Sequence, residues 1–211
     1  MTAKNGILEG SALDGFRMAN SFCSIVGNSA DMKIVCPART LTEIARMLGE
    51  GESLKVYADK NSLSVAVRDT VIGSRLYAGE FVKKENVYPI DFVSKVSVKR
   101  SELIDSIERA SVLIRGEKNS FIQFDIKMNK IIITANSEMG KVEETVSADL
   151  DGKELKIAMN GKFVLDAIKA LTDETIVLSF NTSVSPFTLT NASESRCQYL
   201  VLPVRTANQQ A

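Results

Sequence analysis

Apolar and polar residues alternate along the chain in a pattern that predicts one amphipathic helix and several short strands, and this pattern occurs three times. The helices are predicted at residues 36–47, 99–110 and 160–171. Aligning Ile44, Ile107 and Ile168, which are 63 and 61 residues apart, also aligns apolar residues three positions before and three positions after. An i, i+3, i+6 spacing places apolar side chains on one side of a helix, so each segment should pack against a core.

Each predicted helix follows one short strand and precedes further strand-like runs. The preceding strands are predicted at 32–35, 95–98 and 155–158, and the following runs at 54–58, 63–67, 121–126, 130–135, 176–180 and 187–190. β-branched and aromatic residues fill these runs, and turn-forming residues separate them, as in antiparallel strands. The sequence therefore predicts an α+β fold built from repeated β-α-β-β-β units. A period of about 60 residues indicates duplicated half-domains rather than a solenoid.

The units divide the chain into two predicted domains. Residues 1–31 contain only strand patterns, at 6–12 and 16–25, so they match the end of a unit that lacks its helix. The chain is therefore expected to begin within a domain, either as part of a longer protein or with another segment covering the open face. Domain limits are predicted at 1–90, with the first strand and helix absent and a polar connector at 79–90, and at 91–205. Residues 206–211 form a polar tail.

Local signals refine the first predicted helix. Thr40 followed by Glu43 has the spacing of a capping box, in which the two side chains satisfy free backbone N–H groups at a helix start. Gly49 follows Leu48 and is a natural stop. This helix is therefore expected to begin at Thr40 and to end near Leu48.

Composition argues against several classes of protein. There are 26 basic and 26 acidic residues, so net charge indicates no strongly basic nucleic-acid-binding surface. The three cysteines are scattered, which favours reduced thiols and a cytoplasmic location. No apolar run approaches the length of a membrane span, so no membrane partner is expected.

Residues suited to catalysis are also scarce. The chain has no histidine, the commonest general base and metal ligand, and neither a metal nor a cofactor is predicted. No phosphate-binding loop, dinucleotide-binding glycine motif or nucleophile elbow occurs. Glu143 and Glu144 are adjacent on a predicted strand, so their side chains should point to opposite faces. A non-catalytic protein is expected, and measurable turnover or tight stoichiometric metal binding would favour the enzyme alternative instead.

Two motifs, together with the paired units, carry a family resemblance. Residues 11–20 read SALDGFRMAN, a loop with Asp14-Gly15-x-Arg17, and the predicted last strand, residues 199–205, reads YLVLPVR. In this order and spacing they resemble the bacterial sliding clamp, the β subunit of DNA polymerase III, over essentially the whole chain. The resemblance implies a DNA-clamp fold, with helices on an inner face and antiparallel sheets on an outer face. It also implies a non-catalytic processivity factor that forms a homodimeric ring around double-stranded DNA, independently of sequence.

The resemblance further implies a site for protein partners. In this family the DNA polymerase III α subunit, the clamp loader and other proteins with a clamp-binding motif dock a short peptide into a hydrophobic groove. The residues that carry over to this groove are Leu13, Gly15, Phe16, Arg17, Met18, Val82, Val87, Asn160, Phe163, Val184, Pro186, Leu200, Val201, Leu202, Pro203, Val204 and Arg205. Phe163 lies off the apolar stripe of its own helix, which suits an exposed site. Phe16 and Met18 lie beside a turn, so an exposed ring and an exposed, flexible methionine side chain are expected there. A second small core cluster beneath the connector is the alternative.

The helix faces opposite the apolar stripes predict where DNA would lie. Arg39 and Arg46 make this face basic in the first helix, and Arg100 stands at the start of the second. These three arginines are the predicted DNA-facing residues. The same faces of the other helices carry Glu102, Asp105 and Asp166, for which a simply solvated surface is the alternative.

Several positions depart from the family pattern. Residues 81–84 read Phe-Val-Lys-Lys where the family commonly has Phe-Pro-Asp-Tyr, Asn86 replaces a usual arginine, and Phe16 replaces a usual histidine. These departures leave the peptide preference and the depth of the groove open. Ring closure in the family pairs the first domain of one chain with the third domain of another. A shortened clamp that binds partner peptides without closing a ring is therefore the alternative function.

Overall fold

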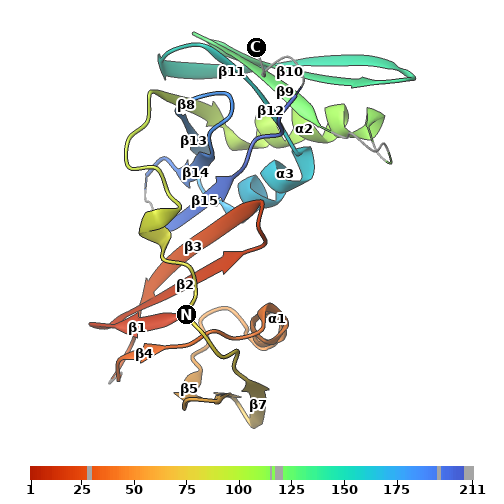
Figure 1. The fold of residues 1–211 in the computed structure, drawn as a ribbon. Coiled ribbons are helices and arrows are strands. Elements are labelled where there is room, and N and C mark those ends of the chain that lie inside the picture. Colours follow the sequence, from red (N-terminus) through yellow and green to blue (C-terminus); the bar gives the residue numbers. More distant parts are fainter. Residues whose placement is uncertain (28–29, 115, 117–120, 194–195, 207–211) are drawn as a thin grey trace. The chain divides into compact units, whose positions relative to one another are not determined.

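All three predicted helices are present in the structure, a computed structural model that describes residues 1–27, 30–114, 116, 121–193 and 196–206 (Figure 1). They are α1 (Ala38–Met47), α2 (Arg100–Leu113) and α3 (Gly161–Ala170). The chain folds as two compact units. The first consists of Met1–Ala12 and Ser21–Asn86, and the second consists of Leu13–Asn20 and the chain from Val87 onward. Residues 13–20 of the SALDGFRMAN stretch therefore belong to the second unit, and residues 11–12 belong to the first.

The second unit is built from two successive β-α-β-β-β units, as the periodicity predicts. Its first repeat contains β8 (Ser94–Lys99), α2, β9 (Ile122–Lys127), β10 (Lys130–Ser137) and β11 (Gly140–Gly152). Its second repeat contains β12 (Leu155–Met159), α3, β13 (Thr175–Phe180), β14 (Phe187–Asn191) and β15 (Cys197–Val201). The strand order is β12-β9-β10-β11-β8-β13-β14-β15, with antiparallel pairing throughout this series.

The long strand β11 joins the two halves of this sheet. Residues 140–147 pair with β10, and residues 148–152 pair with β8. Gly152 ends the second stretch with a φ of +119°, and a Cβ built there would lie 2.2 Å from the Val93 carbonyl oxygen. Only glycine fits this backbone conformation and this close approach. Gly152 therefore allows β11 to reach β8.

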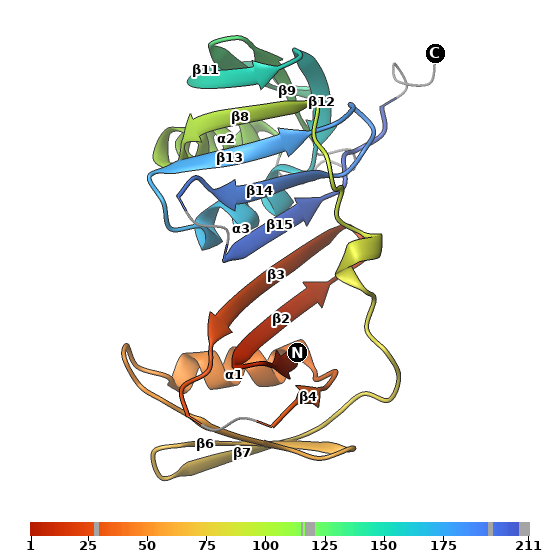
Figure 2. The same cartoon turned by 90° about the vertical axis from the view of Figure 1, so that its left-hand side faces the viewer.

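Both helices of the second unit cover the same face of its sheet, behind β8, β13, β14 and β15 in Figure 2. Alternate residues of each strand point toward them, so Ile122, Phe124 and Ile126 of β9 are completely buried. Leu103 and Ile107 of α2 fill the same core. The α+β class, with helices on one face and antiparallel sheets on the other, is confirmed.

The first unit is smaller and contains one helix. Its strands are β1 (Thr2–Lys4), β2 (Ile7–Leu13), β3 (Arg17–Ser24, whose first residues belong to the second unit), β4 (Met32–Lys33), β5 (Lys55–Ala58), β6 (Ser62–Val67) and β7 (Thr70–Arg75). Within this unit the strand orders are β2-β1-β4 and β5-β6-β7. Ile44 of α1 packs with Ile34 and with Leu63, Val65 and Val67 of β6. A short 3-10 helix, η1 (Lys84–Asn86), follows in the connector.

Two local expectations, the capping box of the first helix and a last strand through residues 199–205, differ from the structure. The capping box is wrong: α1 begins after Pro37, and the Thr40 hydroxyl is hydrogen-bonded to Ser74 at 2.8 Å instead. Proline supplies a helix-compatible φ, so the helix starts two residues earlier than the Thr-Glu spacing suggests. The last strand ends at Val201, and residues 202–205 continue outside it. The polar tail, apart from Thr206, lies outside the described residues. The domain limits at 90 and 205 stay a prediction.

Candidate functional site

The loop before β3 is a tight turn that exposes an aromatic ring. Asp14 Oδ1 accepts hydrogen bonds from the backbone N–H groups of Phe16 and Arg17, both at 3.1 Å. Gly15 has a φ of +88°, a conformation that glycine adopts without strain. Asp side chains often stabilise turns in this way, by accepting hydrogen bonds from backbone N–H groups that follow them in the chain. The turn leaves Phe16 with 62% of its surface exposed.

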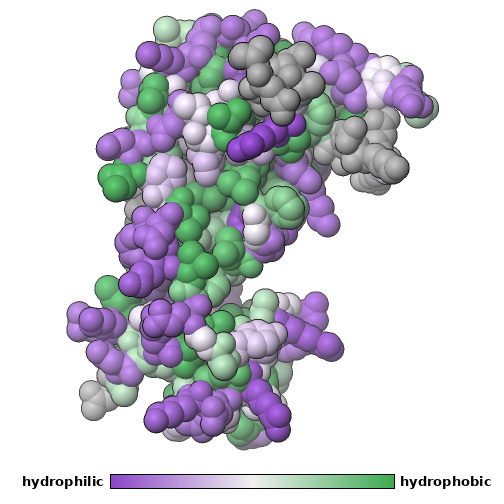
Figure 3. Space-filling view, in the orientation of Figure 1, coloured by the Kyte–Doolittle hydropathy of each residue, from purple (hydrophilic) through white to green (hydrophobic). Residues whose placement is uncertain are grey.

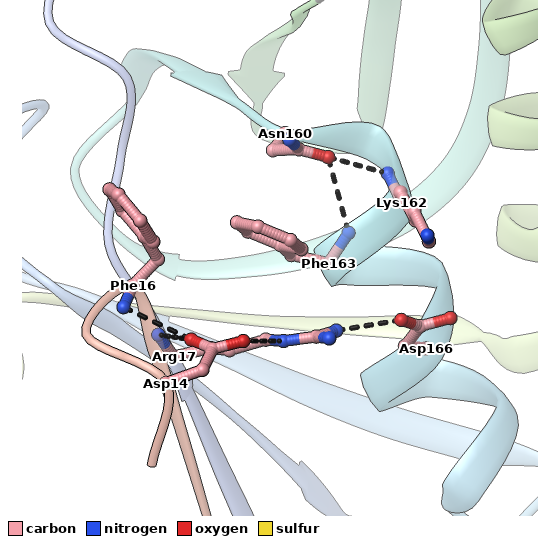
Figure 4. Close-up of polar contacts among 7 residues, drawn as sticks. All are labelled: Asp14, Phe16, Arg17, Asn160, Lys162, Phe163 and Asp166. Carbon is pink, nitrogen blue, oxygen red and sulfur yellow. Dashed lines mark hydrogen bonds and ion pairs between the residues drawn. The ribbon is translucent and has the colours of Figure 1, made fainter.

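The Arg17 guanidinium connects this loop to α3. Its Nε–H donates to Asp14 Oδ2 at 2.8 Å, and its Nη1–H donates to Asp166 Oδ2 at 2.7 Å (Figure 4). The guanidinium also lies over the Phe163 ring, 4.5 Å from its centroid. The hydrogen bonds that Arg17 donates to the two carboxylates raise the pKa of Arg17, and the bond to Asp14 lowers the pKa of Asp14. Arg17 and Asp14 therefore both remain charged at neutral pH.

The first turn of α3 places Phe163 opposite the loop. Asn160 precedes the helix, and its Oδ1 accepts the backbone N–H groups of Lys162 at 3.0 Å and Phe163 at 3.4 Å. This cap satisfies free donors and fixes where the helix begins. The half-buried Phe163 ring then stacks on Phe16, with ring centroids 6.2 Å apart and planes inclined by 30°. Phe16, Phe163 and Arg17 thus form one layered cluster, here called the aromatic cluster.

The chain after β15 runs alongside this cluster. The Leu202 N–H donates to the Phe16 carbonyl at 2.9 Å, and the Val204 N–H donates to the Ala158 carbonyl at 2.8 Å. Leu202 keeps an exposed side chain. Because its backbone is bonded to the loop, its side chain is held close to the aromatic cluster. Figure 3 shows hydrophobic side chains gathered over β15 and α3 on this face of the second unit.

A tyrosine of the connector fastens the backbone beneath this surface. The Tyr88 hydroxyl lies within hydrogen-bonding distance of two carbonyl oxygens, 3.1 Å from Gln198 and 3.4 Å from Met18. Burial raises the pKa of Tyr88 far above its ordinary value. The hydroxyl therefore stays protonated and remains a donor. Val87, the preceding residue, is half-buried in the same unit.

Burial separates the predicted groove residues into two groups. Leu13, Phe16, Val184 and Leu202 are exposed apolar residues. Half-buried members surround them: Arg17, Val87, Asn160, Phe163, Pro186, Pro203 and Val204. Gly15 and Arg205 are also exposed. All of these belong to the second unit, whereas Val82, also exposed, belongs to the first.

The expectation that Met18 offers an exposed, flexible side chain is wrong. Met18 is only 1% exposed, and Leu200 and Val201 are also buried. Along β3 the side chains alternate, so the residue two positions after the exposed Phe16 faces the interior once the strand has begun. These three side chains support the surface from below, and a ligand would not touch them without a rearrangement.

The predicted DNA-facing arginines differ in how freely they are exposed. Arg39 and Arg46 of α1 are exposed, and Arg46 pairs with Glu43 at 3.0 Å. Arg100 is half-buried, and its Nε–H donates to the Asp173 carbonyl at 3.0 Å. Its guanidinium is therefore partly engaged within the second unit. Among the described residues, Arg46 is the one of these three that pairs with a carboxylate.

Acidic groups offset the basic groups of α2 and α3. Arg109 pairs with Glu144 at 2.7 Å, and Lys169 pairs with Glu108 at 2.6 Å. Glu143, next to Glu144, pairs instead with Lys141 on the opposite face of β11. The two adjacent carboxylates therefore point apart, as their strand position predicts. Within the described ranges no group of three or more potential ligand residues could hold a metal ion, and no described helix is long and apolar enough to cross a membrane.

Two family models match consecutive parts of the chain. The central domain of the DNA polymerase III beta subunit matches residues 1–83, and its C-terminal domain matches residues 85–205. The chain belongs to the DNA polymerase III beta subunit family. A relative named beta sliding clamp, from Halalkalibacterium halodurans, is 30% identical over 210 residues, which is 96% of this chain and 55% of the relative.

Solved structures agree with this assignment. The DNA polymerase sliding clamp of Bacillus subtilis has a TM-score of 0.92 at 28% identity, covering 97% of this chain and 55% of that one. The DNA polymerase III beta subunit of Thermotoga maritima has a TM-score of 0.89 at 28% identity, covering 98% and 56% respectively. The chain thus spans about half the length of the curated relatives it matches.

Sequence reasoning missed two residues of this site. Asp166 was placed on a solvated helix face, yet it binds Arg17, which is 149 positions away. Tyr88 was placed in the connector without a role, yet it is hydrogen-bonded to β15 and to Met18. For Asp166 the only local signal is its position one helical turn after Phe163, since residues three apart share a helix face.

Proposed function

We propose that this chain supplies the central and C-terminal parts of a bacterial sliding clamp, a non-catalytic processivity factor of DNA replication. Its partners are the DNA polymerase III α subunit, the clamp loader and other proteins that carry a clamp-binding motif. Each docks a short peptide on the second unit, and in the complete ring two chains encircle double-stranded DNA. The family assignment supports the class of function, and the aromatic cluster supports the site.

The observation that carries the peptide site is the exposed Phe16 stacked on Phe163 beside Leu202. Large apolar side chains are rarely left exposed together without a partner, and aromatic residues dominate the energetics of docking sites. Hydrogen bonds hold these three residues in place: Asp14 bonds to the loop, Asn160 caps α3, and Leu202 bonds to Phe16. A surface arranged before binding loses less conformational freedom when a peptide docks. Val87 of the connector, which lies in the second unit, would extend the same groove.

The neutral composition suits the proposed contact with DNA. A closed ring retains DNA topologically, so it needs few phosphate contacts and no base contacts. Arg39 and Arg46 of α1 are the exposed basic groups available for this role, with Arg100 as a partly engaged third. Weak, sequence-independent contacts would allow the ring to slide. Replication takes place in the bacterial cytoplasm, the location proposed for this chain.

A peptide titration tests the proposal. A labelled clamp-binding peptide is expected to bind in the micromolar range, about −8 kcal/mol. Leu202→Asp should abolish saturable binding, because the substitution places a charge on the apolar surface while leaving the backbone bond to Phe16 intact. Met139→Asp is the matched control, since Met139 is an 89% exposed apolar residue at the β10–β11 turn.

The outcomes separate clearly. Saturable binding that survives in the control and is lost in Leu202→Asp supports the peptide site. Absence of binding by a folded wild-type sample, or equal binding by all three proteins, would contradict it. Folding is checked for each protein by its far-ultraviolet circular dichroism and its melting temperature.

A further inference from the structure

Arg17 is held between two carboxylates that come from different walls of the proposed groove. Asp14 belongs to the same loop as Arg17 and binds its Nε at 2.8 Å. Asp166 belongs to α3 and binds its Nη1 at 2.7 Å. The structure therefore links the loop wall to the helix wall through one guanidinium. Both links lie within the second unit.

The helix geometry explains why this link also fixes Phe163. Asp166 follows Phe163 by three positions in α3, so the two side chains share one face of the helix. A guanidinium that reaches Asp166 from the loop passes across the face of the Phe163 ring, and Arg17 is found there at 4.5 Å. The same ring also stacks on Phe16. Phe163 thus contacts both a cation and a second ring.

We propose that Asp166 is a positioning residue of the peptide site, which acts through Arg17 to hold the Phe163 ring in its binding orientation. This inference rests on the proposed function and adds a residue outside the predicted groove. Asp166 keeps Arg17 across the ring, whereas Asp14 alone tethers the guanidinium only from the loop side. Without Asp166, Arg17 can swing toward solvent and Phe163 gains rotamers that do not bind. Peptide affinity then falls because the site must be ordered during docking.

The two ion pairs of Arg17, with Asp14 and with Asp166, should contribute little to folding stability. All three partners are partly exposed, with side chains 33%, 45% and 49% accessible for Arg17, Asp14 and Asp166. Exposed ion pairs are screened by solvent and contribute little. A substitution of Asp166 that lowers peptide affinity without lowering the melting temperature therefore distinguishes a positioning role from a purely structural one.

The test compares Asp166→Asn with Glu108→Gln in the full chain. Both substitutions turn a carboxylate into an amide and remove one exposed ion pair, but Glu108 pairs with Lys169 and has no contact with the aromatic cluster. The probe is a clamp-binding peptide without charged side chains, so that long-range charge effects stay small. Asp166→Asn is expected to weaken binding about three- to tenfold, in line with loss of an ion pair and a cation–π contact. Glu108→Gln should bind as the wild type does, and both melting temperatures should change equally little.

A double-mutant cycle and a spectroscopic readout complete the experiment. In an Arg17→Lys background, which lacks the planar two-sided contact, Asp166→Asn should have little further effect. The aromatic NMR signals of Phe163, assigned by comparison with Phe163→Leu, should shift in Asp166→Asn and not in Glu108→Gln. This readout needs no peptide.

Each alternative result overturns the inference. If the wild type binds and Asp166→Asn binds equally well, Asp166 does not position the site, while the proposed function stands. If the loss persists in the Arg17→Lys background, Asp166 acts on the peptide directly. If the Phe163 signals do not move, the ring is fixed by other contacts. If the wild type fails to bind, the proposed function is wrong, yet the Phe163 signals still decide whether Asp166 orders the ring.

Discussion

Truncation of Phe16 should weaken peptide binding more than it lowers folding stability. In the free protein 62% of its surface is exposed, so only about a third of the ring contributes to folding. Complete burial of a Phe side chain is worth roughly 1.5–3 kcal/mol, and the buried share is therefore worth about 1 kcal/mol at most. Phe16→Ala should lower the free energy of unfolding by no more than that amount.

The cost to binding follows from the part of the ring that is still exposed. An aromatic side chain has about 200 Å² to bury, so a peptide that covers the exposed 62% removes roughly 120 Å² from water. On the same scale of roughly 1.5–3 kcal/mol for a fully buried Phe side chain, the exposed 62% is worth about 1–2 kcal/mol, an upper value because the peptide covers the ring incompletely. Phe16→Ala is therefore expected to weaken peptide binding by about 1–2 kcal/mol, roughly 5- to 30-fold.

Titration and thermal melting of the same samples check this expectation. Phe22→Ala is the matched control, because Phe22 is an exposed Phe of β3 that belongs to the first unit. The control should bind peptide as the wild type does. A Phe16→Ala protein that melts far below the wild type but binds normally would refute the reasoning, since Phe16 would then be a core residue and not a contact residue.

Two further predictions concern pH and the backbone. Peptide affinity should stay constant between about pH 5.5 and 8.5, because the chain has no histidine and the N-terminal amine, whose pKa is lowered by burial, lies in the first unit. The pKa of Asp14 is lowered in the folded state. Its contribution to folding stability is therefore fully present above pH 3.8, its ordinary pKa, and is lost as the pH falls through the lower pKa of the folded state. Peptide binding that weakens near pH 6.5 would contradict this expectation. Gly152→Ala should destabilise the second unit by about 3 kcal/mol or more, because a positive φ and a clash with the Val93 carbonyl coincide there. Gly140 has a positive φ but no atom within 4 Å of a built Cβ, so Gly140→Ala should lower the free energy of unfolding clearly less in chemical denaturation. Equal losses in the two variants would show that the clash at Gly152 is easily relieved.

Periodicity alone predicted the elements that surround the site. The apolar spacing around Ile107 and Ile168 placed both helices of the second unit within a few residues of their observed ends. The alternation in β9 and β10 predicted those strands for the same reason, since neighbouring side chains point to opposite faces. The start of α1 was misplaced because two local signals competed, and Pro37 prevailed over the Thr-Glu spacing.

The candidate site was only partly predictable. Phe16 and Phe163 were identified through the family resemblance, and the structure adds that their rings stack. The side chain of Met18 was expected at the surface, yet it is buried, because the strand that begins at Arg17 decides which way it points. No local pattern shows that burial.

The sequence by itself determined the repeated β-α-β-β-β order, the helix faces and the family. Each of these depends on residues a few positions apart or on whole motifs. Only the tertiary structure decided which charges meet. Asp166 and Arg17 are 149 positions apart, and they come together because the sheet of the second unit brings α3 next to the loop before β3. An ion pair between such distant segments has no periodicity to reveal it, so its position over Phe163 follows from the packing of the elements and not from their order.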